Sequence, residues 1–164
     1  MVDTVESLAA RLRKLEDINA IQELKNRYWR ACDRKQPDVV RDCFRPDATI
    51  DAAFLGVHEG RDSFVGLFEM VGCRDSIIDM HHGQNPSIVL DENDPDKAHG
   101  TWDLFFYQIN LDNRSASQAA GYYEDDYVRI DGRWWIQTSV FRVTSTQMTE
   151  VTEQDSFKVT MFGR

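Results

Sequence analysis

Two adjacent histidines, His81 and His82, are the residues of this sequence best suited to proton transfer. An imidazole gains and loses a proton near neutral pH, so it can take a proton from a substrate and return it. Successive residues of a strand point to opposite faces, so only one of the two can enter a given pocket. Counting back by twos from Ile88 and Leu90 favours His82, unless a bulge at 85–86 reverses the alternation in favour of His81.

Asp33 is the carboxylate that could assist such a histidine. It ends the first predicted helix, where the helix dipole disfavours negative charge, and a histidine partner would explain an acid in that place. The alternative is a solvated loop carboxylate beside Arg34 and Lys35.

Three further polar residues could complete a site. Tyr28 follows Leu24 on the apolar stripe of the first helix, so it is a core residue whose phenol could also donate a hydrogen bond to a substrate. Asp103 is a charge within an aromatic strand segment and faces either solvent or the pocket. Arg142 shares the alternation of Trp134, which predicts that it points inward, where its guanidinium could hold an enolate or carboxylate oxygen. A structural ion pair is the alternative for Asp103 and for Arg142.

Other chemistries lack their usual residues. His58 and His99 have no ligand-like spacing, and we expect no metal. The three cysteines, Cys32, Cys43 and Cys73, form no C-x-x-C pair, which argues against a disulfide framework or a structural zinc site. The sequence contains no glycine-rich phosphate loop and no nucleophile elbow, so we expect neither covalent catalysis nor a cofactor.

Composition limits the protein class. A chain of 164 residues fits one domain, 1–164, and 41% hydrophobic with 29% charged residues is typical of a globular protein. The net charge of −9 is spread along the sequence and would repel nucleic acid. No start resembling a signal peptide and no run of eighteen apolar residues occurs, which predicts a cytoplasmic protein without a membrane span.

The first third of the sequence predicts helices. Apolar residues recur every three or four positions over 8–28, a pattern typical of an amphipathic helix, here with a possible break near Asp17. Pro37 can begin a short helix over 37–43, and 48–51 is predicted to be a strand. A third helix should follow Asp62 or Ser63, with a buried face formed by Phe64, Leu67, Phe68 and Val71.

The remainder predicts strands at 80–90, 98–110, 118–130 and 134–146, separated by turn-forming residues. The alternating tail, 157–162, could be an edge strand or a subunit contact. Helices followed by a meander indicate the α+β class: a strongly curved, cone-shaped antiparallel sheet closed by N-terminal helices over an apolar pocket.

A series of landmarks over about 8–145 resembles the SnoaL-like branch of the nuclear-transport-factor-2-like superfamily. They occur in order as Leu15-Glu16-Asp17-Ile18, Tyr28 before Asp33, Phe44-Arg45-Pro46-Asp47-Ala48, Gly60-Arg61, His81 before Asn85-Pro86, Gly100-Thr101-Trp102 and Asp131-Gly132-Arg133-Trp134-Trp135.

This resemblance implies a cone-shaped fold with a deep pocket, and His81 as the base that Asp33 orients and charges. Together with Tyr28, Asp103 and Arg142, these residues resemble the polar set of bile-acid-type dehydratases. The implied activity is a cofactor-independent, dehydratase-like lyase acting on a small, apolar, ring-containing substrate. Tyr28 and Arg142 would stabilise developing oxygen charge, and Asp103 would assist the departure of hydroxide.

Fold alone leaves other functions open. The same groups could serve an isomerase, a cyclase or an epoxide hydrolase, and the family also includes non-catalytic binding or assembly subunits. Family members usually associate through the open sheet face, which implies a homo-oligomer, either a dimer or a trimer.

Overall fold

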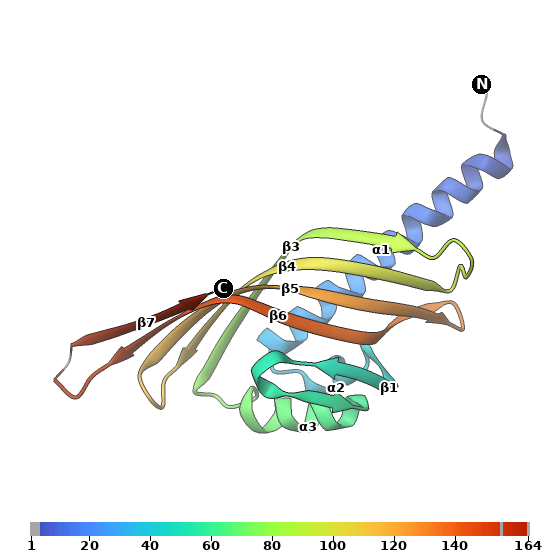
Figure 1. Ribbon diagram of the computed structural model, residues 1–164. Coiled ribbons are helices and arrows are strands. Elements are labelled where there is room, and N and C mark those ends of the chain that lie inside the picture. The colour runs from blue at the N-terminus through green and yellow to red at the C-terminus, as the bar shows by residue number, and fades with distance from the viewer. Residues whose placement is uncertain (1–3, 155, 164) are drawn as a thin grey trace.

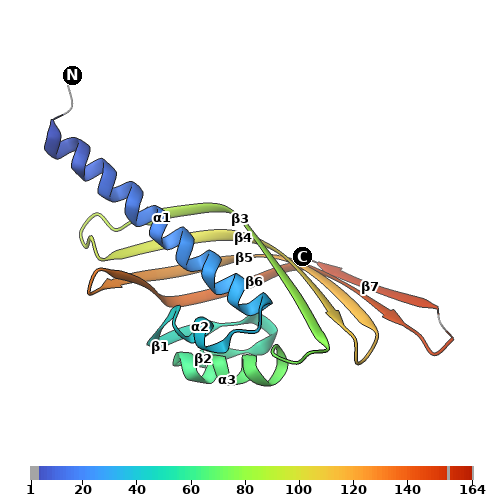
Figure 2. The ribbon, with the colours of Figure 1, turned by 180° about the vertical axis from the view of Figure 1, so that it is seen from behind.

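The computed structural model describes residues 4–154 and 156–163. Its first element, the helix α1 (Val5–Asp33), is continuous through Asp17, so the possible break there is absent. Thr4 caps it by accepting a hydrogen bond from the backbone of Ser7. Only the second half of α1 is buried, and its first half, including Leu12, extends past the sheet (Figures 1 and 2).

Short elements follow α1 and form one edge of the sheet together with the helices packed against it. They are α2 (Pro37–Arg41), β1 (Phe44–Asp51), the 3-10 helix η1 (Ala53–Leu55), β2 (Val57–Glu59) and α3 (Arg61–Val71). Helix α3 buries Phe64 and Phe68 as predicted, but Val65 is buried where Val71 was expected, and Val71 is exposed. Among the described helices, none combines the length and the hydropathy needed to cross a bilayer.

Four long strands form most of the sheet. They are β3 (Ile77–Leu90), β4 (Lys97–Asn110), β5 (Ser115–Ile130) and β6 (Arg133–Val151), and the tail forms β7 (Phe157–Gly163). The order is β2-β1-β6-β5-β4-β3, with β7 paired to the far end of β6. The α+β prediction is confirmed, but the sheet is mixed rather than purely antiparallel, because β1 runs parallel to β6.

Irregularities in two of these strands reverse their inside–outside alternation. In β3 the register with β4 shifts between Gln84 and Ser87, and Asn85 has a positive φ of 50°. In β6 the register with β5 shifts at Gln137. Its neighbours Ile136 and Thr138 pair with consecutive residues of β5, so Gln137 is the extra residue. A bulge inserts one extra residue, so side chains beyond it change faces.

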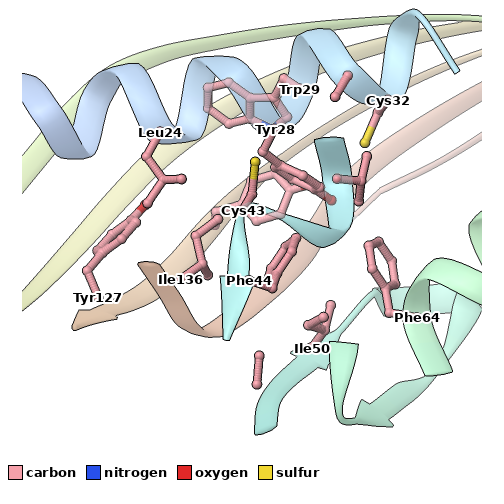
Figure 3. Close-up of a cluster of buried hydrophobic side chains, with 14 of the residues drawn as sticks. Leu24, Tyr28, Trp29, Cys32, Cys43, Phe44, Ile50, Phe64, Tyr127 and Ile136 are labelled. Atoms are coloured by element: carbon pink, nitrogen blue, oxygen red, sulfur yellow. The ribbon is translucent and has the colours of Figure 1, made fainter. Parts of the chain in front are cut away.

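The core lies between α1, the sheet and the short elements. Figure 3 shows side chains of α1, among them Leu24 and Tyr28, directed toward Phe44 and Ile136. We call the face of the sheet that contacts α1 the inner face and the opposite one the outer face.

Candidate active site

Asp33 and His81 form a hydrogen-bonded pair where the end of α1 meets β3. The distance between His81 Nδ1 and Asp33 Oδ1 is 2.6 Å, and the backbone N–H of His81 donates to the same carboxylate at 3.1 and 3.2 Å. The two side chains are 13% and 23% exposed, for His81 and Asp33 respectively. The carboxylate therefore fixes both the position and the ring orientation of a partly accessible histidine.

The turn after α1 anchors this carboxylate to the sheet. Lys35 adopts a positive φ of 54°, and its ammonium group donates to the carbonyls of Gly72 at 2.8 Å and Ile77 at 2.5 Å. Ile77 begins β3, four residues before His81. A single side chain thus ties the helix end that carries Asp33 to the strand that carries His81.

The bulge at Asn85 decides which histidine faces α1. His81 pairs with Phe106, which alternates with the buried Leu104, whereas His82 pairs with the exposed Phe105. His81 is therefore on the inner face. The sequence pattern predicted this outcome only for the case of a bulge at 85–86, and that bulge is present.

A row of paired residues runs across the inner face from His81. The imidazole lies 4.7 Å from the Phe106 ring, between centroids. Phe106 pairs with Ala119, Ala119 with Thr146, and Thr146 with Phe162 of β7. The Thr146 hydroxyl is buried and has no hydrogen-bond partner among the described residues. The row is apolar apart from its histidine and one hydroxyl.

Asp79 is a second carboxylate beside His81 that the sequence interpretation missed. It lies two residues earlier in β3 and accepts a hydrogen bond from Gln108 at 2.9 Å. Burial raises the pKa of Asp79 above its usual value, and the hydrogen bond from Gln108 offsets only part of this effect. The signal that could have found it was its spacing, because a residue two positions from His81 shares its face of the strand.

Tyr28 is a core residue, as its place on the apolar stripe predicted. Its ring meets that of Phe44 edge-on at 5.1 Å, and it is 5% exposed. Burial raises the pKa of its phenol well above the usual value. The phenol is therefore neutral, and its additional role as a hydrogen-bond donor to a substrate stays a prediction.

A buried ion pair lies next to Tyr28 and was also missed. Lys25 Nζ is 2.7 Å from Asp125 Oδ2, and both side chains are 0% exposed. Asp125 also accepts hydrogen bonds from Tyr127 and Ser139, each at 2.7 Å. The Lys25 ammonium lies 3.7 Å from the centroid of the Tyr123 ring. This network fills the space between α1 and the middle of the sheet.

Arg142 and Asp103 do not join Asp33 and His81. The prediction that Arg142 points inward is wrong, because the bulge at Gln137 moves it to the outer face, where it binds Asp51 at 2.5 Å. Asp103 is exposed on the outer face and accepts a hydrogen bond from Asn85 at 2.8 Å. The alternative of a structural ion pair describes Arg142, with Asp51 rather than Asp103 as its partner.

Two recesses open elsewhere on the molecule. One, of about 430 Å³, is bounded by β6, η1 and β7; its lining includes Phe141, Val143 and Thr146, and also the ion pair of Arg142 with Asp51. Thr146 also belongs to the row that begins at His81. The recess therefore adjoins the end of that row, away from the pair formed by Asp33 and His81. A second, of about 620 Å³, lies between α1, α2 and the turn before β6. Within residues 4–154 and 156–163, no three side chains of the types that bind metals are grouped closely enough to hold an ion.

Known structures share this fold. The dehydrochlorinase LinA aligns with a TM-score of 0.75 at 21% identity, over 87% of this chain and 95% of its own. LinA-type3 from Novosphingobium barchaimii LL02, a hexachlorocyclohexane dehydrochlorinase, aligns with a TM-score of 0.70 at 20% identity, over 92% and 94%. A proposed scytalone dehydratase from Novosphingobium aromaticivorans aligns with a TM-score of 0.73 at 23% identity, over 81% and 87%.

The sequence itself also carries a family signature. The profile of the SnoaL-like domain matches residues 13–140, a span that includes both Asp33 and His81. The chain therefore belongs to the SnoaL-like domain family.

Proposed function

We propose that this protein is a cofactor-independent lyase of the dehydratase type, in which His81 is the general base. The observation that carries the proposal is the 2.6 Å contact between Asp33 and His81 Nδ1. A proton on Nδ1 is held by Asp33, so the lone pair of the ring resides on Nε2, which has no hydrogen-bond partner among the described residues. Nε2 of His81 can therefore accept a proton from a substrate carbon.

The elimination proceeds as follows. Nε2 of His81 takes a proton from a carbon next to a carbonyl or to the carbon that bears the leaving group. The electron pair of that C–H bond forms the new C=C bond, and the leaving group departs with the electron pair of its own bond. Asp33 stabilises the imidazolium that results, because its negative charge is in direct contact with the ring. The products are an alkene and either water or a halide ion.

Asp79 replaces Asp103 as the group that assists the departure of hydroxide. A carboxyl whose pKa is raised by burial keeps its proton to higher pH and can therefore donate it. Departing hydroxide would take that proton and leave as water, and the proton on His81 would return to Asp79 or to solvent after release. Asp103 faces away from the dyad and has no part in this step.

We expect Asp79→Asn to lower dehydration while stabilising the fold. Asparagine keeps the acceptor for Gln108 but cannot donate a proton as a carboxyl does, so kcat should fall by about 10²-fold or more. The folded state holds the Asp79 proton at pH values where the unfolded chain has lost it, so wild-type stability declines as the pH rises through that range. Thermal unfolding across pH should show this decline in the wild type and a smaller one in Asp79→Asn; equal slopes would contradict the assignment.

The substrate class follows from the inner-face row. Phe106 and Ala119 present apolar surface next to the imidazole, and the recess beyond Thr146 adds Phe141 and Val143. Apolar linings with a few polar groups are typical of sites for small organic ligands. These features support a small, apolar, ring-containing substrate.

The proposal is tested with two substrates that differ in leaving group. Scytalone, a cyclic hydroxy ketone, and γ-hexachlorocyclohexane represent the reactions for which two of the structural neighbours are named. Each is incubated with the wild-type protein in D2O, and alkene formation, chloride release and deuterium uptake at carbon are followed by mass spectrometry. We expect alkene formation from at least one compound. A compound whose leaving group the protein cannot expel should instead exchange hydrogen for deuterium at the carbon next to the carbonyl or to the leaving-group carbon. If neither compound gives turnover or deuterium exchange, the result favours the alternative of a non-catalytic binding subunit.

We also propose that the chain forms a homo-oligomer, a dimer or trimer, through the outer face. Exposed apolar side chains gather there on neighbouring strands: Ile78, Met80, Phe105 and Tyr122. A contiguous exposed apolar patch is typical of an interaction surface. Multi-angle light scattering should show a multiple of 19.0 kDa for the wild type and the monomer mass for Phe105→Glu. Val89→Glu, near the opposite end of β3, is the matched control and should leave the mass of the assembly unchanged.

A further inference from the structure

Four arginines line the 620 Å³ recess between α1, α2 and the turn before β6. They are Arg27, Arg30, Arg34 and Arg133, and Glu23 is the only acidic residue in the same lining. The chain as a whole has a net charge of −9, so a concentration of cations runs against its composition. We refer to this recess as the arginine groove.

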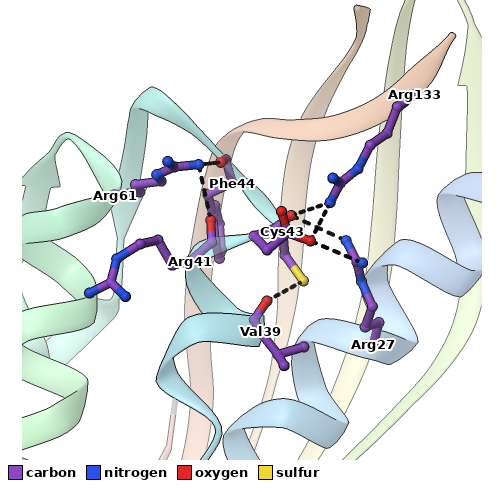
Figure 4. A network of polar contacts seen from close by, with 8 residues as sticks. Arg27, Val39, Arg41, Cys43, Phe44, Arg61 and Arg133 are labelled. Atoms are coloured by element: carbon purple, nitrogen blue, oxygen red, sulfur yellow. Dashed lines mark hydrogen bonds and ion pairs between the residues drawn. The ribbon is translucent and has the colours of Figure 1, made fainter. Parts of the chain in front are cut away.

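Two of these arginines converge on one carboxylate. Arg133 donates to the Asp42 carboxylate at 2.6 Å and to its carbonyl at 2.5 Å, and Arg27 reaches the same two groups at 3.3 and 3.2 Å. Figure 4 shows Arg27 and Arg133 approaching the chain beside Cys43 from α1 and from β6. Hydrogen bonding to Arg133 lowers the pKa of Asp42. Asp42 offsets one of the two positive charges, and each guanidinium has donors left over.

The other two arginines lie along α1. Arg30 is 3.7 Å from Glu23, a contact between two side chains that are more than half exposed and are therefore weakly coupled. Arg34 follows the last residue of the helix. The negative end of the helix dipole favours cations at these two positions, but it explains neither Arg133 on β6 nor Arg27 two turns earlier. Asp42 and Glu23 together offset two of the four positive charges, which leaves the groove with a net charge of +2.

The floor of the groove is apolar and buried. Leu24, Ala31 and Trp134 are each at most 6% exposed and lie beneath the charged rim. A volume of about 620 Å³ is within the range of small-molecule sites. Because the rest of the protein is acidic, a large polyanion would be repelled outside the groove, whereas a compact one would not.

We propose that the arginine groove binds a small organic polyanion that carries at least two carboxylate or phosphate charges. Planar guanidinium groups with free donors bind both kinds of oxyanion in a bidentate manner. Neither Asp33 nor His81 lines the groove, so this is a second site, independent of the proposed lyase reaction.

The test is isothermal titration of the wild-type protein with pyrophosphate, citrate and acetate at one fixed ionic strength. We expect pyrophosphate or citrate to bind with a dissociation constant below about 1 mM, and acetate at least tenfold more weakly. The stronger of the two probes identifies phosphate or carboxylate as the preferred group. The double variant Arg30→Gln/Arg34→Gln, which leaves the contacts of Asp42 in place, should weaken binding at least tenfold.

A charge-matched control separates a site from general attraction. Arg13→Gln/Lys14→Gln removes two cations from the exposed first half of α1, outside the groove, and should leave the affinity unchanged. Equal weakening by both double variants, or no binding of either polyanion, would overturn the proposal, as would binding of polyglutamate alone. His81→Gln should bind the probes normally, so a failure of the lyase assignment would not be mistaken for a failure here.

Discussion

His81→Gln should lower the kcat of the elimination by about 10²–10⁴-fold, the usual contribution of a general base. Glutamine can still fill the space and donate a hydrogen bond to Asp33, but it cannot take a proton from carbon at neutral pH. Asp33→Asn should have a comparable effect, because an amide can orient the ring but cannot stabilise an imidazolium by charge. Initial rates on whichever substrate the wild type converts provide the measurement.

The neighbouring histidine supplies the control for this prediction. His82→Gln changes the same side chain one position along β3, on the outer face, and should leave kcat within a few-fold of wild type. Circular dichroism and thermal unfolding of all three variants establish that they are folded. Full turnover by His81→Gln, or a loss confined to His82→Gln, would contradict the assignment of the base.

Lys25→Met should destabilise the fold by about 3–5 kcal/mol, the cost of leaving one member of a buried ion pair without its partner. Asp125 is 0% exposed, and its remaining hydrogen bonds, from Tyr127 and Ser139, are neutral. Burial lowers the pKa of Lys25 despite the contact with Asp125, so burial disfavours the Lys25 ammonium by more than that contact favours it. Urea unfolding, followed by tryptophan fluorescence, measures the change in free energy.

A double variant and a surface pair complete that experiment. Lys25→Met/Asp125→Asn removes both charges and should be less destabilised than the sum of the two single variants, because the charge left uncompensated in each single variant is gone. Lys97→Met removes a cation from the exposed pair with Asp94 and should cost less than about 1 kcal/mol. A loss below about 1 kcal/mol for Lys25→Met would mean that the buried pair contributes little.

Local patterns in the sequence were sufficient for the helices, whereas the pairing of Asp33 with His81 was implied only by the family resemblance, because counting by twos favoured His82. Apolar spacing located α1 and α3, and the unfavourable position of Asp33 at a helix end indicated a nearby partner. The bulge at Gln137 had no comparable signal, so counting by twos placed Arg142 on the wrong face. A strand pattern predicts faces only as far as the next irregularity.

The buried charges were overlooked for a different reason. Lys25 lies between Leu24 and Tyr28 on the buried face of α1, and Asp125 alternates with Tyr123 and Tyr127, so both occupy core positions in the pattern. A charged side chain at a core position has no explanation in the pattern of either segment, and only the three-dimensional pairing of Lys25 with Asp125 supplies one. The parallel contact of β1 with β6 was equally beyond local patterns, because it joins segments about ninety residues apart.

The bulge at Asn85 makes the choice between His81 and His82 a matter of counting residues. Deleting one residue between Gln84 and Ser87 would remove the bulge but keep the pairing on both sides of it, so His81 would stay opposite Phe106 on the inner face. Deleting Gly83, with the bulge and the register with β4 from Gln84 onward both kept, would instead place His82 opposite Leu104, facing α1, and His81 opposite Phe105 on the outer face. Single-residue insertions and deletions between the two histidines and the bulge are therefore a short evolutionary route by which a relative with the same fold could lose its base or acquire another.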